Sequence, residues 1–135
     1  MEQSNSIMQL RTTLIFAAIS GMIAVMLGAF GAHALKEHLI STGRLDTYNL
    51  AVEYQFYHSL ALLATGLVAQ SGKTRQLSIA AVSFAAGILI FSGSLYILAI
   101  FNVPIAGAIT PIGGVGLIAG WLFLILHFYK RKRSS

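Results

Sequence analysis

The sequence predicts an all-α membrane protein, a bundle of four transmembrane helices with both termini in the cytoplasm. Of its 135 residues, 56% are hydrophobic and only 10% are charged, whereas soluble domains carry about 25% charged residues. So few charges could not cover a water-facing surface. Because one span needs roughly 20 apolar residues, the chain has room for four spans with short connections, and we expect a single domain over residues 1–135.

Four apolar segments are long enough to be these spans. We place them at residues 14–32, 47–69, 77–101 and 111–129. The first and third contain no charged residue, whereas the second carries Glu53 and His58 near its start. In the fourth, we expect Thr110 as the N-cap and Pro111 as the first helical residue. At that position a backbone N–H would have no acceptor within the helix, so its absence in proline costs nothing. The apolar connection 102–109 is expected in the membrane interface or in the mouth of the bundle.

The basic residues give the predicted bundle a direction. Seven of the nine Lys and Arg residues lie on one side of the four-span pattern, at Arg11, Lys73, Arg75 and Lys130 to Arg133. The other side has only Lys36 and Arg44. The positive-inside rule therefore places both termini in the cytoplasm. A basic tail directly after a span is expected to meet anionic lipid headgroups, and we expect no nucleic acid partner.

The first span also resembles a secretory signal peptide. Arg11 precedes an apolar run that ends in Ala32-His33-Ala34, a possible cleavage site. The run of 19 residues is longer than the usual apolar region of about 7–15 residues. Cleavage would also leave three spans and reverse the side of the basic tail. A retained span is the favoured interpretation.

Small residues form two stripes that predict close helix packing. In the first span they recur at spacings of four and three, at Ala17, Gly21, Ala24, Gly28 and Gly31. In the fourth span the stripe is Gly113, Gly116 and Gly120. Helices in lipid gain no hydrophobic drive from association, so small residues that allow close backbone approach mark helix interfaces. A role in admitting a ligand or letting helices slide is the alternative.

A candidate polar cluster lies on the non-cytoplasmic side. It consists of His33, Glu37, Glu53, Tyr54, Gln55 and His58. His33 and Glu37 would share a helix face if the first helix ran past the membrane edge, and Tyr54 shares a face with His58. Glu53 and His58 are about 140° apart around one helix, so they cannot aim at one ligand. Without cysteine or a metal-binding motif, we expect no metal and no cofactor.

His58 is the most informative single residue, because an ionisable group inside a span suggests a functional site. A structural role, with a hydrogen bond between helices, is the favoured interpretation, and a proton or ligand role is the alternative. The expected partners are His33, Tyr96 or a backbone carbonyl of residues 102–109. Trp121 is expected to be packed or to face lipid.

Several runs resemble the motifs of a known family. They are Leu27 to Lys36, Glu53 to Leu62, Gly93 to Tyr96, Thr110 to Gly114 and the pair Gly120-Trp121. In this order they resemble the YgdD-like small bacterial inner-membrane proteins of unknown function, over residues 14–129. The resemblance implies a four-span bundle in the inner membrane and relatives in eukaryotes. It implies no activity.

Three functions remain open at this point. The favoured one is a non-enzymatic protein that packs with itself, as a homo-oligomer, or with a larger membrane-protein partner. The second is a small transporter or channel-like oligomer that uses His58 and Glu53. The third is a membrane enzyme, or a subunit of one, that acts on lipid or quinone and needs His33, Glu37, Glu53 and His58 to converge. Whether the chain is an enzyme stays open.

Overall fold

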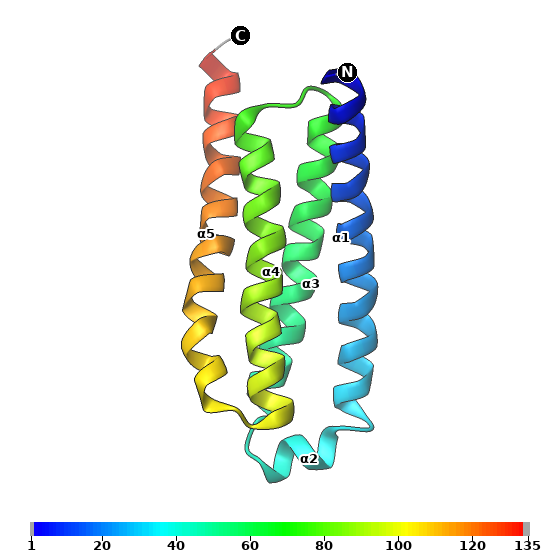
Figure 1. The fold of residues 1–135 in the computed structure, drawn as a ribbon, viewed down its shortest axis with the longest axis vertical. Helices are drawn as coiled ribbons and strands as arrows, with labels where there is room; N and C mark the ends of the chain where they lie inside the picture. The colour runs from blue at the N-terminus through cyan, green and yellow to red at the C-terminus, as the bar shows by residue number, and fades with distance from the viewer. Residues whose placement is uncertain (1, 134–135) are drawn as a thin grey trace.

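The described part of the chain is entirely helical. The computed structural model describes residues 2–133, without the side chains of residues 2, 3, 6, 132 and 133. Within that range there are five α-helices and no strand: α1 (Glu2–Ala32), α2 (Lys36–Ser41), α3 (Leu45–Gln70), α4 (Arg75–Phe101) and α5 (Pro104–Arg133). The four long helices run side by side, and α2 lies across the end opposite to the two termini (Figure 1). We call these ends the α2 end and the terminal end.

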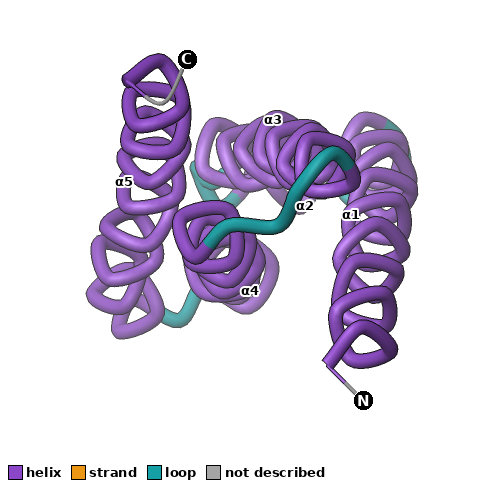
Figure 2. The backbone as a smooth tube through the Cα atoms, turned by 90° about the horizontal axis from the view of Figure 1, so that it is seen from above, coloured by secondary structure: helices purple, strands orange, loops and turns teal. Residues whose placement is uncertain are grey.

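The long helices are not packed equally. Helix α4 makes extensive contacts with α3 and α5, and α3 makes extensive contacts with α1, whereas α1 touches α4 at few points. The view along the helices shows α3 and α4 at the centre, with α1 and α5 on opposite flanks (Figure 2). Helices α3 and α4 therefore carry most of the buried polar groups, and α1 and α5 each cover one side of this central pair.

Three of the helices are long and apolar enough to cross a membrane. Among the described residues, these helices are Ile7–Ala32, Arg75–Phe101 and Pro104–Arg131. These helices correspond to the first, third and fourth predicted spans. Helix α3 has a similar length of 26 residues, but its polar residues, which include Glu53, Gln55 and His58, lower its mean hydropathy. The predicted second span is therefore not among the three.

The prediction that the last helix begins at Pro111 is wrong. Helix α5 begins at Pro104 and contains Pro111 in its interior. Asn102 ends α4 in the left-handed conformation, with φ of 52°, so the connection shrinks to two residues. An internal proline is tolerated between packed helices, where neighbouring Ser and Thr side chains compensate for the lost hydrogen bond. Thr110, expected as an N-cap, instead lies inside α5, with its hydroxyl 2.7 Å from that of Ser94.

The start of α5 at Pro104 rather than at Pro111 explains the apolar character of residues 102–109. Residues 104–109 are the first turns of α5 rather than an irregular connection. A proline at the first position of a helix sacrifices no hydrogen bond, so Pro104 fulfils the role expected of Pro111. An apolar sequence is then ordinary, because it belongs to a helix that is apolar enough to lie in lipid.

The small-residue stripes lie against neighbouring helices. In α1, Ala17 and Ala24 are buried, and a Cβ added at Gly28 would lie 3.3 Å from Val52 of α3. In α5, a Cβ added at Gly113 would collide with the backbone of α4, and one at Gly120 would collide with the ring of Phe84. A Cβ at Gly31 would collide with the ring of Tyr48, whereas those at Gly21 and Gly116 would lie 3.9 Å from Ser59 and 3.4 Å from Gly87. The stripes thus coincide with close approaches of α1 to α3 and of α5 to α4.

Candidate functional site

Polar side chains between α1, α3 and α4 bond one another. Gln55 of α3 donates from Nε2 to the carbonyl of Ser20 in α1, at 3.0 Å. Its Oε1 accepts from the hydroxyl of Tyr96 in α4, at 2.7 Å. One turn further along α3, the hydroxyl of Ser59 lies 2.7 Å from that of Ser20. Gln55 therefore links three helices through groups that lie inside the protein.

Two further hydroxyls join the helices through backbone carbonyls. Tyr48 of α3 donates to the carbonyl of Leu27 in α1, at 2.6 Å. Ser92 of α4 donates to the carbonyl of Ala51 in α3, at 2.8 Å. Both side chains are buried, and a buried hydroxyl needs such a partner, since an unpaired one costs roughly 1–3 kcal/mol. These bonds fix the relative heights of the helices.

His58 is bonded at both ring nitrogens, and its partner on another helix is Trp121. The indole Nε1 of Trp121 lies 3.1 Å from Nε2 of His58. Because an indole N–H can only donate, Nε2 is the acceptor and Nδ1 carries the hydrogen. Nδ1 then donates to the carbonyl of Tyr54, at 2.7 Å. The geometry defines a neutral histidine with a single tautomer.

The three partners expected for His58 are all wrong. Tyr96 bonds Gln55 instead, and no bond joins His58 to His33 or to residues 102–109 in the described part of the chain. The physical reason lies in the rotation of α3, which turns Gln55 toward α1 and His58 toward α5. Trp121 is packed at its inner edge and 47% exposed overall, so it both packs and faces outward.

Aromatic rings surround His58 in what we call the aromatic cluster. Its members are Tyr54, His58, Phe84, Phe91 and Trp121, drawn from α3, α4 and α5. The rings of Tyr54 and Phe91 stack with centroids 4.8 Å apart, and those of Phe84 and Trp121 meet edge to face at 5.3 Å. Such pairs add about 0.5–1.5 kcal/mol beyond the burial of their area. The cluster packs α3 and α5 onto α4.

The six residues of the candidate polar cluster do not converge. His33 lies in the turn after α1, where the N–H of Leu35 bonds the carbonyl of Phe30 at 3.0 Å. The helix face that His33 and Glu37 were expected to share is therefore absent, because α1 ends at Ala32. Both side chains are exposed at the α2 end. The described residues contain no group of three or more His, Cys, Asp and Glu that could hold a metal ion.

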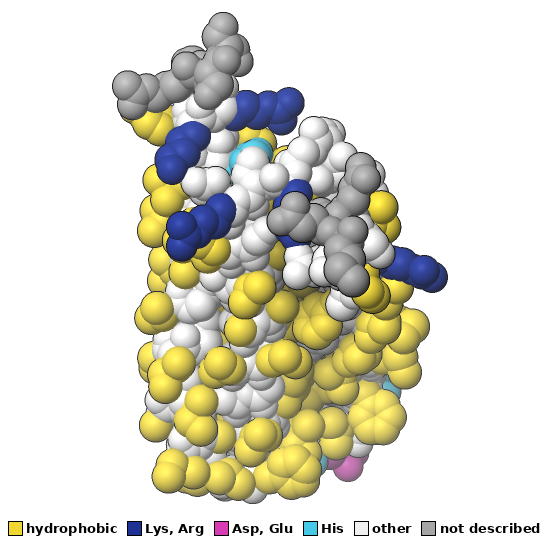
Figure 3. Space-filling view, turned by 45° about the horizontal axis from the view of Figure 1, so that its top comes forward, with side chains coloured by type: hydrophobic (Ala, Val, Ile, Leu, Met, Phe, Trp, Pro, Cys, Tyr) yellow, Lys and Arg dark blue, Asp and Glu magenta, His cyan; other side chains and the backbone are white. Residues whose placement is uncertain are grey.

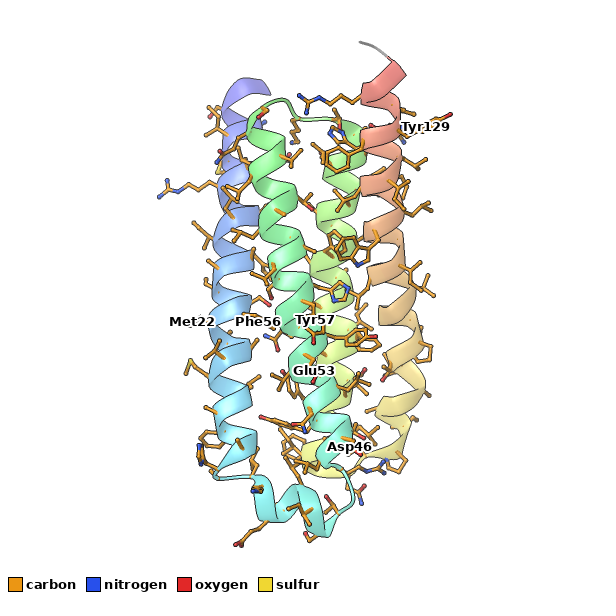
Figure 4. All side chains as sticks on the ribbon, turned by 180° about the vertical axis from the view of Figure 1, so that it is seen from behind. Met22, Asp46, Glu53, Phe56, Tyr57 and Tyr129 are labelled. Atoms are coloured by element: carbon orange, nitrogen blue, oxygen red, sulfur yellow. The ribbon has the colours of Figure 1, made fainter. Side chains whose placement is uncertain are left out.

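Glu53 is separated from the other members of that set. It is exposed on the outward face of α3 (Figure 4), and no described residue bonds its carboxylate. Gln55 and His58 are buried on two other faces of the same helix. The spacing of Glu53 and His58 predicted that their side chains point in different directions. In the structure the first is exposed and the second is buried.

The bonds that close the α2 end were not predicted from the sequence. Nε2 of His38 in α2 lies 2.8 Å from the carbonyl of Ile100 in α4. Arg44 donates from Nε to Oδ1 of Asn102, at 3.0 Å. The one available signal was Asn102 before Val-Pro, since asparagine tolerates the left-handed conformation that ends a helix. The pairing itself joins residues about 60 positions apart, which no local pattern reveals.

The surface divides into a basic end and an apolar flank. Lys and Arg side chains gather at the terminal end, and hydrophobic side chains cover the sides of the long helices (Figure 3). Exposed side chains such as Val25, Leu89 and Ile118, each more than 60% exposed, would be unfavourable in water over so large an area. Three helices of sufficient length and apolarity and this surface together define an all-α integral membrane protein.

Comparison with known proteins specifies the family. The chain belongs to the family described as "Protein of unknown function (DUF423)", which matches residues 27–114. A UPF0382 membrane protein of Staphylococcus saprophyticus is 44% identical, over 90% of this chain and 99% of that protein. The UPF0382 inner membrane protein YgdD of Escherichia coli K12 is 41% identical, over 93% and 95%. The resemblance to YgdD-like proteins is thus confirmed, and no solved structure matches the chain.

Proposed function

We propose that the chain is a non-enzymatic protein of the bacterial inner membrane that acts by packing against a second copy or a larger membrane protein. One observation carries this proposal: the buried polar groups Gln55, Ser59 and His58 are bonded within the chain itself. Groups bonded in this way hold helices together. They leave no convergent set of reactive side chains for catalysis.

The proposal includes four spans, with α3 as the second. Helix α3 has 26 residues and is therefore about 39 Å long, which exceeds the roughly 30 Å of a hydrocarbon core. It packs between α1 and α4, both of which are long and apolar enough to cross. Its polar residues Gln55, His58 and Ser59 are buried, so they contact protein rather than lipid.

Both termini are proposed to be cytoplasmic. Four spans bring the ends of the chain to one side, and α1 begins at the same end of the bundle at which α5 ends (Figure 1). Arg11, Lys73 and Lys130 belong to the same terminal end, whereas Lys36 and Arg44 belong to the α2 end. The positive-inside rule then assigns the terminal end to the cytoplasm. The side chains of Lys132 and Arg133, which also entered the prediction, lie outside the described residues.

The outward face of α3 is the proposed contact surface for the partner. Glu53, Phe56, Tyr57 and Leu60 follow the spacing of one helix face, and all four are exposed. We call them the α3 face. A carboxylate in a membrane span almost always faces the bundle interior or a water-filled cavity and pairs with another group, yet no described residue of this chain bonds Glu53. A neighbouring protein on the α3 face would supply the missing partner.

The alternative, a small transporter or channel-like oligomer using His58 and Glu53, has less support. Transport through these residues needs both side chains along one pathway. Glu53 is exposed on the outward side of α3, while His58 is buried against Trp121. Both ring nitrogens of His58 are already bonded, so a transported proton or ion would have to break the bond to Trp121.

Site-specific photo-crosslinking in native membranes tests the proposal. A photo-reactive amino acid at position 60, in the α3 face, should give a covalent product, and its mass separates a second copy from a larger partner. The matched control is position 25 on α1, where Val25 is also strongly exposed. Equal crosslinking at positions 60 and 25, or none at position 60, would overturn the proposal.

A further inference from the structure

A hollow at the terminal end has the lining expected of an anion site. With a volume of about 380 Å³, it lies where the end of α3, the α3–α4 connection and the end of α5 meet. Its lining includes Lys73, Thr74, Gln76, His127, Lys130 and Arg131. We call it the α3–α5 pocket. It is separate from the aromatic cluster and from the α3 face.

The charges around the α3–α5 pocket have one sign. Lys73, Lys130 and Arg131 line it, and its lining contains no Asp or Glu. Lys73 donates one hydrogen bond to the side-chain oxygen of Gln9, and an ammonium group has three hydrogens to donate. Three cations around one small hollow create a positive potential that attracts an anion.

The N-terminus of α4 adds backbone donors to this potential. This helix has 27 residues and begins at Arg75 after the N-cap Thr74, whose Oγ1 accepts from the N–H of Leu77 at 3.3 Å. The N–H groups of Arg75 and Gln76 bond no acceptor in the described part of the chain. Free N–H groups at a helix start carry the positive end of the helix dipole and bind oxyanions.

His127 supplies an independent indication of a ligand. It is only 6% exposed, and its Nδ1 lies 2.9 Å from Oγ1 of Thr74. Its buried Nε2 has no hydrogen-bond partner among the described residues. Oγ1 of Thr74 accepts from Leu77 and has one hydrogen of its own, which it can donate to Nδ1. In that tautomer Nε2 carries the hydrogen of the ring and is an unpaired, buried donor.

We propose that the α3–α5 pocket binds a phosphate group, either in the headgroup of an anionic phospholipid or as a free phosphate. A phosphate oxygen would accept from Nε2 of His127, which removes the unpaired donor. The remaining oxygens would meet Lys73 and the free N–H groups at the start of α4. Both sources present negatively charged phosphate oxygens that accept hydrogen bonds. The inference does not depend on the α3 face or on any partner protein.

The test measures binding by the full chain in a neutral detergent, with native mass spectrometry as the readout. The probes are phosphatidic acid, a diacylglycerol with the same acyl chains, and inorganic phosphate. We expect phosphatidic acid to bind and diacylglycerol not to bind. Competition by inorganic phosphate at similar concentrations identifies free phosphate as the natural source, and its absence identifies the lipid headgroup.

Two variants connect that binding to the pocket. Lys73→Gln and His127→Phe should each weaken phosphatidic acid binding by about tenfold, the effect of one lost charge-assisted hydrogen bond. The matched control is Arg11→Gln, which removes a cation from the terminal end but not from the pocket lining. Because Lys73 is exposed, Lys73→Gln should fold normally. Its affinity for phosphatidic acid can therefore be measured even if His127→Phe fails to fold. Equal binding of phosphatidic acid and diacylglycerol, or unchanged affinity in Lys73→Gln, would overturn the proposal.

Discussion

The hydrogen bond from Trp121 defines the protonation state of His58, the ionisable residue that the sequence places inside a span. Trp121 can only donate, so its bond to His58 requires an unprotonated Nε2 and a neutral imidazole. An imidazolium has two N–H groups and no acceptor, and protonation would replace this bond by a repulsion between two donors. In the structure His58 therefore acts as a connector between α3 and α5 through the aromatic cluster.

A double-mutant cycle measures this connection. We expect Trp121→Phe and His58→Phe each to destabilise the protein, because each change leaves a polar group without its partner. The double variant should be less destabilised than the sum, with a coupling of about 0.5–1.5 kcal/mol, the range of hydrogen bonds between membrane helices. Reversible unfolding in mixed micelles provides the free energies. A coupling near zero would mean that the bond contributes nothing.

At the scale of helices, glycine determines how closely α4 and α5 approach. A Cβ at Gly113 of α5 would meet the backbone of Phe91 in α4, and a Cβ at Gly116 would lie 3.4 Å from Cα of Gly87. Backbone cannot move aside as a flexible side chain can. Gly87 and Gly116 face each other, and the side chain of Leu117 in α5 lies directly against Gly87. The small residues at both positions allow the most extensive helix contact in the molecule.

Gly113→Ala and Gly93→Ala test this role in closely matched positions. Alanine is the better helix former by about 1 kcal/mol, so it should stabilise a helix wherever its Cβ has room. A Cβ at Gly93 has no neighbour within 4 Å, and we expect Gly93→Ala to be neutral or stabilising. Gly113→Ala should instead cost about 1–3 kcal/mol through overpacking. Thermal unfolding in detergent compares the two, and equal melting temperatures would contradict the packing argument.

Helix existence could be predicted from the sequence, but several helix boundaries and contacts could not. The apolar runs of α1, α4 and α5 are strong local patterns, and Thr74 is an ordinary N-cap before α4. Pro104 and Pro111 are equally acceptable first residues by local rules. The choice between them depends on how α5 packs on α4 beside Ser94, which is tertiary information. The contact between His58 and Trp121 spans 63 residues and depends on the relative rotation of α3 and α5.

At the scale of the whole molecule, the buried polar face of α3 explains why α3 is not among the three helices that are apolar enough to cross a membrane. Mean hydropathy treats all faces of a helix alike. In α3 the polar residues Gln55, Ser59 and Thr65 are buried against other helices, where protein groups replace water as partners. In the proposed four-span arrangement, lipid contacts only the remaining faces of α3. Among those, the exposed carboxylate of Glu53 is the exception that the proposed partner explains.

Labelling of single cysteines tests whether α3 crosses the membrane, and so whether the whole molecule has four spans or three. The chain has no cysteine, so Ser41→Cys at the end of α2 and Ser71→Cys just after α3 each introduce one exposed thiol. If α3 crosses the membrane and the basic terminal end is cytoplasmic, a membrane-impermeant maleimide should label Ser41→Cys in intact cells and Ser71→Cys only after lysis. Labelling of both in intact cells, or of neither, would mean that α3 does not cross. Labelling of Ser71→Cys alone in intact cells would mean that α3 crosses the membrane in the opposite direction. The four spans would then stand, but the orientation derived from the positive-inside rule would be wrong.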